Sequence, residues 1–117
     1  WRTPSLWVSK KLGEAILKLP TKIRVGRRWY SVEVVEAMLD RSVMGSVHYD
    51  DRRIQLGRTS NTTGRKFKPE EIADTFWHEM VHTILKDMGE HRLNSNEAFV
   101  TKFANRLTEA INTARFE

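Results

Sequence analysis

The stretch from Pro69 to Met88 constrains the fold most, because helix-starting and helix-ending residues bound it. Proline suits the first turn of a helix, and the acidic pair Glu70 and Glu71 complements the positive end of the helix dipole. Gly89 is a typical helix stop. The apolar side chains between these ends recur at the spacing of a buried helix face; they are Ala73, Trp77, Met80, Val81, Ile84, Leu85 and Met88. The pattern predicts a long helix packed against a core.

Within this predicted helix, residues 78–82 read His-Glu-Met-Val-His. Residues four apart lie one above the other on the same helix face, so the imidazoles of His78 and His82 can hold one zinc ion between them. Glu79 can reach a water in the open coordination position and take its proton. Two alternatives stay open: a hydrogen-bonded histidine pair in the core, and a surface salt bridge for Glu79.

A catalytic zinc site usually has three protein ligands, so the sequence after His82 must supply a third. The extended pattern His-x-x-Gly-x-x-His is absent, because Leu85 and Met88 occupy its Gly and His positions. Glu97 is the preferred candidate, since counting from it along a helix reaches the predicted core positions, and an inward carboxylate needs a partner. His91 is the reserve candidate. Alternatively, Asn94-x-x-Glu97 fits a capping box, in which Glu97 only satisfies a backbone N–H.

The remaining segments predict an α+β fold in which a small antiparallel sheet packs on the His-Glu-x-x-His helix and on a C-terminal helix. Alternating apolar residues and turn signals predict two hairpins, and the helical periodicity predicts two further helices. The hairpin strands are residues 22–25 with 29–35 and residues 45–49 with 53–56, and the further helices are residues 9–19 and 95–115. The helix of residues 95–115 is expected to pack antiparallel to that of residues 69–88 through a short connection. Residues 1–117 are expected to form one domain.

Composition excludes several classes of protein. The chain has no cysteine, which removes disulfides and thiolate zinc sites, and no apolar run approaches the ~18 residues of a membrane span. A cytoplasmic location is expected. Residues 1–68 contain 15 Lys+Arg against 6 Asp+Glu, or +9, whereas residues 69–117 contain 5 against 9, or −4. The basic part of the chain is either an ordinary solvated surface or a contact for nucleic acid or an acidic protein.

Three blocks of sequence resemble the ImmA/IrrE-type zinc metallopeptidases, and more narrowly their short versions from phages and mobile elements. They are residues 75–85 (TFWHEMVHTIL), residues 96–100 (NEAFV) and residues 45–56 (GSVHYDDRRIQL). The resemblance implies a zincin-like fold and a minimal gluzincin with zinc on His78, His82 and Glu97, and with Glu79 as catalytic acid/base. It leaves the partner that orients a ligating histidine unassigned; Asp74 is one candidate, although an exposed surface aspartate is the simpler interpretation.

The sequence therefore predicts zinc-dependent hydrolysis of peptide bonds, with a peptide or regulatory protein as substrate. Tyr49 or His48 is expected to donate to the developing oxyanion, with His91 and Arg92 as weaker candidates. The second predicted hairpin could offer an edge strand to an extended peptide. The alternative hypothesis is a non-catalytic binding module, in which zinc is structural or absent and the basic surface contacts DNA or an acidic protein.

Overall fold

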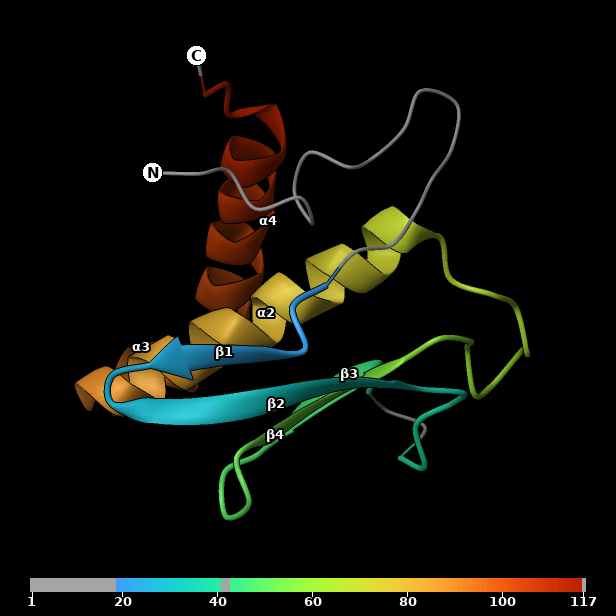
Figure 1. The fold of residues 1–117 in the computed structure, drawn as a ribbon, viewed down its shortest axis with the longest axis horizontal. Helices are drawn as coiled ribbons and strands as arrows, with labels where there is room; N and C mark the ends of the chain where they lie inside the picture. The colour runs from blue at the N-terminus through green and yellow to red at the C-terminus, as the bar shows by residue number, and fades with distance from the viewer. Residues whose placement is uncertain (1–18, 41–42, 117) are drawn as a thin grey trace.

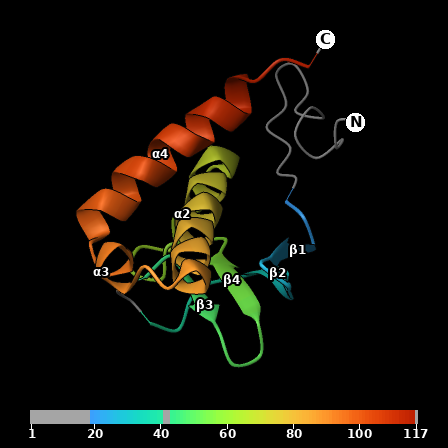
Figure 2. The same ribbon diagram turned by 90° about the vertical axis from the view of Figure 1, so that its left-hand side faces the viewer.

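The computed structural model describes residues 19–40 and 43–116 as a four-stranded sheet with three helices on one side of it. The long helix α2 (Pro69–Met88) packs on the sheet, and α4 (Glu97–Thr113) crosses α2, as the two views in Figures 1 and 2 agree. The expected α+β class is confirmed. The helix expected over residues 9–19 lies, apart from Leu19, outside the described residues.

The sheet consists of β1 (Lys22–Val25), β2 (Arg28–Val35), β3 (Gly45–His48) and β4 (Arg53–Gly57), in the order β1-β2-β4-β3. Both predicted hairpins are present as antiparallel pairs. The expectation of a purely antiparallel sheet was wrong, because β2 and β4 pair in parallel.

The parallel pair has a topological cause. The next strand after β2 in the sequence, β3, does not pair with β2 but lies at the edge of the sheet. The chain then turns back, and β4 lies between β2 and β3. Main-chain bonds hold this arrangement at both ends of the parallel pair: Ser31 N donates to Arg52 O at 2.9 Å, and Arg58 N donates to Val35 O at 2.8 Å. The edge position of β3 leaves one side of its backbone unpaired within the sheet.

The core lies between the sheet and α2. Ile54 and Leu56 on the central strand β4 are fully buried, as is Phe76 of α2, and strand alternation puts these β4 side chains on the helix side. A second cluster joins the far side of α2 to α4 through Val81, Leu85, Val100 and Ala104. Some positions of the predicted stripes are solvent-exposed instead, because α4 covers only part of α2; the clearest are Met88 and Phe103.

Side chains and backbone close both ends of α2. At its start, the Glu71 carboxylate accepts from the backbone N–H of Lys68 at 2.8 Å and from both terminal nitrogens of Arg65. At its end, Gly89 has φ +76°, a left-handed conformation, and its N–H reaches the carbonyls of the last turn. The predicted bounds of this helix are confirmed.

Candidate metal centre

A short helix turns the chain between α2 and α4 and so brings a third polar side chain to the two histidines. This helix, α3 (His91–Asn94), occupies the connection in which only a loop was expected. The next helix begins at Glu97, where the Asn96 side chain caps it by accepting from Phe99 N at 3.1 Å. The alternative interpretation, a capping box formed by Asn94 and Glu97, is therefore wrong, and the Glu97 carboxylate faces α2.

His78, His82 and Glu97 converge on one point. Glu97 Oε2 lies 3.2 Å from His78 Nε2, and Glu97 Oε1 lies 2.7 Å from His82 Nε2. One potential ligand atom from each residue falls within 4.8 Å of the others, and no other group of this kind occurs among residues 19–40 and 43–116. Two imidazoles and a carboxylate form a donor set that suits a divalent metal. The three residues could therefore hold a metal ion.

The periodicity argument placed Glu97 in the core, and this expectation was wrong. Its side chain is 64% exposed, whereas those of His78 and His82 are 24% and 20% exposed. The carboxylate therefore contacts the histidine pair from the solvent-exposed side of the cleft. Solvent and a ligand can therefore reach the point where the three residues meet.

Asn94 orients one of the histidines and was missed by the sequence analysis. Its Oδ1 lies 2.6 Å from His82 Nδ1. An amide oxygen can only accept, so Nδ1 carries a proton, and in the neutral imidazole Nε2 then has its lone pair toward Glu97. The partner proposed from sequence, Asp74, lies on the cleft wall and interacts with Thr108. In the sequence, Asn94 is only a polar residue between the two helices, and it was interpreted as a helix cap.

Glu79 lies beside this group and is partly buried. Desolvation by the surrounding protein raises the pKa of its carboxyl to about 7, with the nearby Glu97 adding to the rise and His82 opposing it. Desolvation also lowers the pKa of His78, which favours the neutral imidazole that binds metals. A carboxyl group with a pKa near neutrality can both accept and return a proton, so Glu79 has the properties of a general base.

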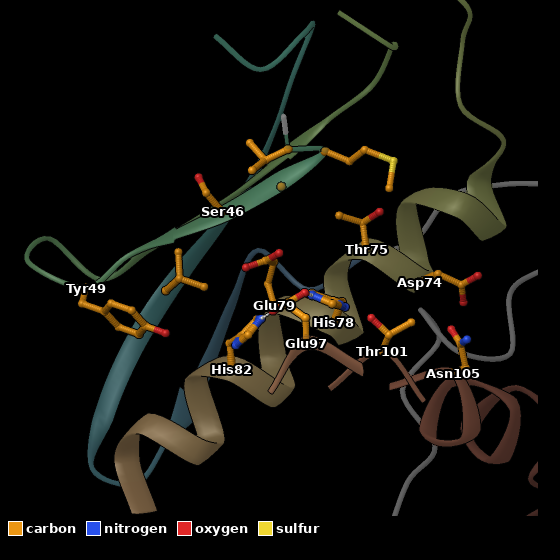
Figure 3. A pocket seen from close by; sticks show the side chains of 14 residues that line it. Ser46, Tyr49, Asp74, Thr75, His78, Glu79, His82, Glu97, Thr101 and Asn105 are labelled. Atoms are coloured by element: carbon orange, nitrogen blue, oxygen red, sulfur yellow. Dashed lines mark ion pairs between the residues drawn. The ribbon is translucent and has the colours of Figure 1, made fainter. Parts of the chain in front are cut away.

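These side chains lie in an open cleft of about 610 Å³ between β3 and the start of α4 (Figure 3). Val43 to Val47 form its sheet side, and Asp74, Thr101 and Asn105 lie at the end away from Tyr49. Gly45 lets β3 approach α2 closely, because a Cβ at this position would lie 2.7 Å from Thr75 Cγ2. The free edge of β3 therefore runs directly beside the candidate metal centre.

Tyr49 is the only predicted oxyanion donor that lines the cleft among the residues described. Figure 3 places its ring on the sheet side, near Glu79 and His82. Desolvation raises its pKa, with Glu79 adding to the rise and a hydrogen bond from Asn94 opposing it, so the hydroxyl stays protonated and can donate.

The other candidate donors lie elsewhere. Strand alternation turns His48 to the opposite face of the sheet, where its Nε2 lies 3.1 Å from Gln55 Oε1. His91 and Arg92 are exposed on α3 and do not line the cleft. The structure therefore does not support His91 as the third metal ligand. It also does not support His48, His91 or Arg92 as the oxyanion donor.

Comparisons with protein-family models, with curated proteins and with solved structures find no match for this chain. None of the helices in the described part of the chain is long and apolar enough to cross a membrane.

Proposed function

We propose that this protein is a zinc-dependent metallopeptidase. The observation that carries the proposal is the convergence of His78, His82 and Glu97 beside the partly buried Glu79 carboxyl, in a cleft bordered by a free strand edge. Two histidines, one carboxylate and an accessible fourth position are the usual ligand pattern of a hydrolytic zinc site. The resemblance to ImmA/IrrE-type peptidases supports the same proposal, and with it a zincin-like fold, a phage or mobile-element origin and a cytoplasmic location.

In this proposal the side chains of the cleft divide the work of peptide hydrolysis. When bound, zinc supplies a Lewis acid that polarises a carbonyl and lowers the pKa of water. Glu79 takes a proton from the attacking water and delivers it to the leaving amine, which its pKa of about 7 suits. Asn94 holds His82 in the tautomer that leaves Nε2 free for the metal. The Tyr49 hydroxyl donates to the oxyanion that develops on the substrate carbonyl.

The edge of β3 supplies a means of aligning the substrate. An extended peptide can add to an unpaired strand edge through main-chain hydrogen bonds, which depend little on its sequence. The first three residues of β3, from Gly45 to Val47, line the cleft. We infer that a flexible segment of a protein, such as an exposed loop of a regulatory protein, is the substrate.

Two variants test the proposal when zinc content and peptide cleavage are measured together. Glu79→Gln should bind about one zinc per chain, as the parent protein does, while cleavage of a mixture of unstructured peptides falls at least about 100-fold. Glu97→Ala should lose most of the zinc as well as the activity. Cleavage that survives in Glu79→Gln, or full zinc binding in Glu97→Ala, would contradict the proposed roles.

The alternative function, a non-catalytic binding module, is favoured by one observation. The β1–β2 hairpin exposes Lys22 and Arg24 beside the half-exposed Trp29. Lys22 Nζ lies over the Trp29 ring, 4.7 Å from its centroid. Cations next to an exposed aromatic ring suit a nucleic acid. If this is the function, Glu79→Gln should leave the activity of the protein, namely binding, unchanged, and the parent protein should cleave no peptide.

A further inference from the structure

A second hollow, of about 520 Å³, lies between the β1–β2 turn and the last turn of α2. It is lined by Gly26, Arg27, Arg28, Tyr30, Tyr49, Lys86 and Asp87. Gly26, with φ +62°, allows the turn to approach the helix, because a Cβ here would lie within 2.4 Å of the Asp87 carboxylate. The hollow is therefore formed by segments far apart in the sequence.

The hollow is positively charged and its cations are not neutralised by salt bridges. It contains Arg27, Arg28 and Lys86 against the single carboxylate of Asp87. Of the ion pairs in residues 19–40 and 43–116, none involves these three cations. Register places the exposed Arg28 on the helix side of the sheet, because it pairs with the buried Val25. The charge of the hollow suits an anionic group of modest size.

Tyr49 connects this hollow to the candidate active site. Its side chain lines both, and Lys86 Nζ lies 4.9 Å from the centroid of its ring. Tyr49 also directly follows β3, which ends at His48. An extended peptide paired along the β3 edge would therefore pass Tyr49 as it leaves the cleft, and its next side chains would reach Arg27, Arg28 and Lys86.

We propose that the basic hollow is a specificity subsite, which binds the Asp or Glu side chains of an acidic substrate segment on one side of the scissile bond. This proposal rests on the proposed function, because it takes the cleft as the place where the peptide is cut. An acidic peptide fits better than a nucleic acid, since the hollow is concave and adjoins the cleft in which the peptide would lie. A nucleic acid would instead contact the outer sheet face, where Lys22, Arg24 and Trp29 lie.

Binding to the uncleaving, zinc-loaded Glu79→Gln protein tests the subsite separately from catalysis. The probes are two short fluorescein-labelled peptides, identical except that one carries a run of glutamates and the other a run of glutamines, with a single-stranded oligonucleotide as the third probe. Fluorescence anisotropy should give about tenfold tighter binding of the glutamate peptide, as expected for two or three partly exposed ion pairs. Adding Arg27→Gln and Arg28→Gln should abolish this preference.

The matched control is the pair Lys22→Gln and Arg24→Gln, which removes the same charge from the same hairpin but on the outer sheet face. It should keep the preference for the glutamate peptide. Equal affinity for both peptides, or equal loss in both double variants, would overturn the subsite and leave only a general effect of net charge. Tighter binding of the oligonucleotide, lost in the control pair, would overturn it in favour of a nucleic-acid surface. None of these outcomes depends on whether the parent protein cleaves peptides.

Discussion

At the scale of single residues, the candidate centre depends on side chains that hold one another in place. Asn94 accepts from His82 Nδ1 at 2.6 Å, and Glu97 lies 2.7 Å from Nε2 of the same ring. The imidazole is thus hydrogen-bonded at Nδ1 by a residue from outside its own helix, while its Nε2 faces the Glu97 carboxylate. Such a partner orients the ligand and increases its basicity, so it contributes to metal affinity without touching the metal.

Replacing Asn94 should therefore weaken zinc binding. In Asn94→Ala the His82 ring loses its acceptor and can rotate or change tautomer, and we expect zinc affinity to fall about tenfold or more. Competition with a chromophoric chelator measures this affinity directly. Asn105→Ala is the matched control, because Asn105 lines the same cleft at its other end. Equal zinc affinity in the two variants would show that Asn94 has no such role.

At the scale of secondary-structure elements, α2 is the rigid support of the site, and its first turn depends on one carboxylate. Glu71 accepts two hydrogen bonds from Arg65 and one from the backbone N–H of Lys68. The hydrogen bonds from Arg65 and then that from Lys68 lower the pKa of Glu71 from its ordinary value of 4.5 to about 2. The ionised form of Glu71 therefore stabilises the folded state.

This stabilisation should have a defined pH dependence. Because the folded-state pKa is depressed, the contribution is complete above about pH 4.5 and is lost as the pH falls toward 2. Glu71→Gln should accordingly have a lower Tm than the parent protein near neutral pH, and the two should converge near pH 2. Thermal unfolding followed by circular dichroism across this range measures the difference. Glu70→Gln, which removes the same charge from the same turn, should show no such convergence; a Tm difference independent of pH in Glu71→Gln would refute the assignment.

At the scale of the whole molecule, the candidate site joins two helices that pack separately. His78 and His82 belong to α2, which is packed on the sheet, whereas Glu97 begins α4, which is held to α2 by the cluster containing Val81 and Val100. A metal bound by all three would connect α4 to the rest of the fold. Metal binding and folding stability are then linked.

Zinc should therefore raise the thermal stability of the protein. At a zinc concentration 100 times the Kd the gain is about 2.7 kcal/mol, which for a chain of this size is a Tm rise on the order of 10 °C. Chelation should reverse the rise, and Glu97→Ala should remove most of it. Val100→Ala is the control: it leaves a cavity in the α2–α4 contact and costs about 2 kcal/mol, but it should keep the zinc-dependent rise. A rise that persists in Glu97→Ala would mean that α4 contributes no ligand.

The parts of this protein that the sequence determined by itself are those set by local geometry. The four-residue spacing of His78 and His82 puts both rings on one face of any helix, and Pro69 and Gly89 end that helix wherever it packs. The two hairpins follow in the same way from alternating apolar residues and turn signals. Glu97 was preferred because helical periodicity placed it on the inward face, and that burial argument was wrong although the residue does meet the two histidines.

Tertiary structure decided everything that depends on which segments become neighbours. The parallel pairing of β2 with β4 depends on the path of the chain between β2 and β3, which no local pattern encodes. Asn94 meets His82 only because α3 reverses the chain, and the raised pKa of Glu79 reflects burial by segments distant in sequence. The connection between the cleft and the basic hollow at Tyr49 likewise requires the β1–β2 turn to lie against the end of α2. Hydrogen bonds and desolvation act between spatial neighbours, and in these cases the fold alone supplies the neighbours.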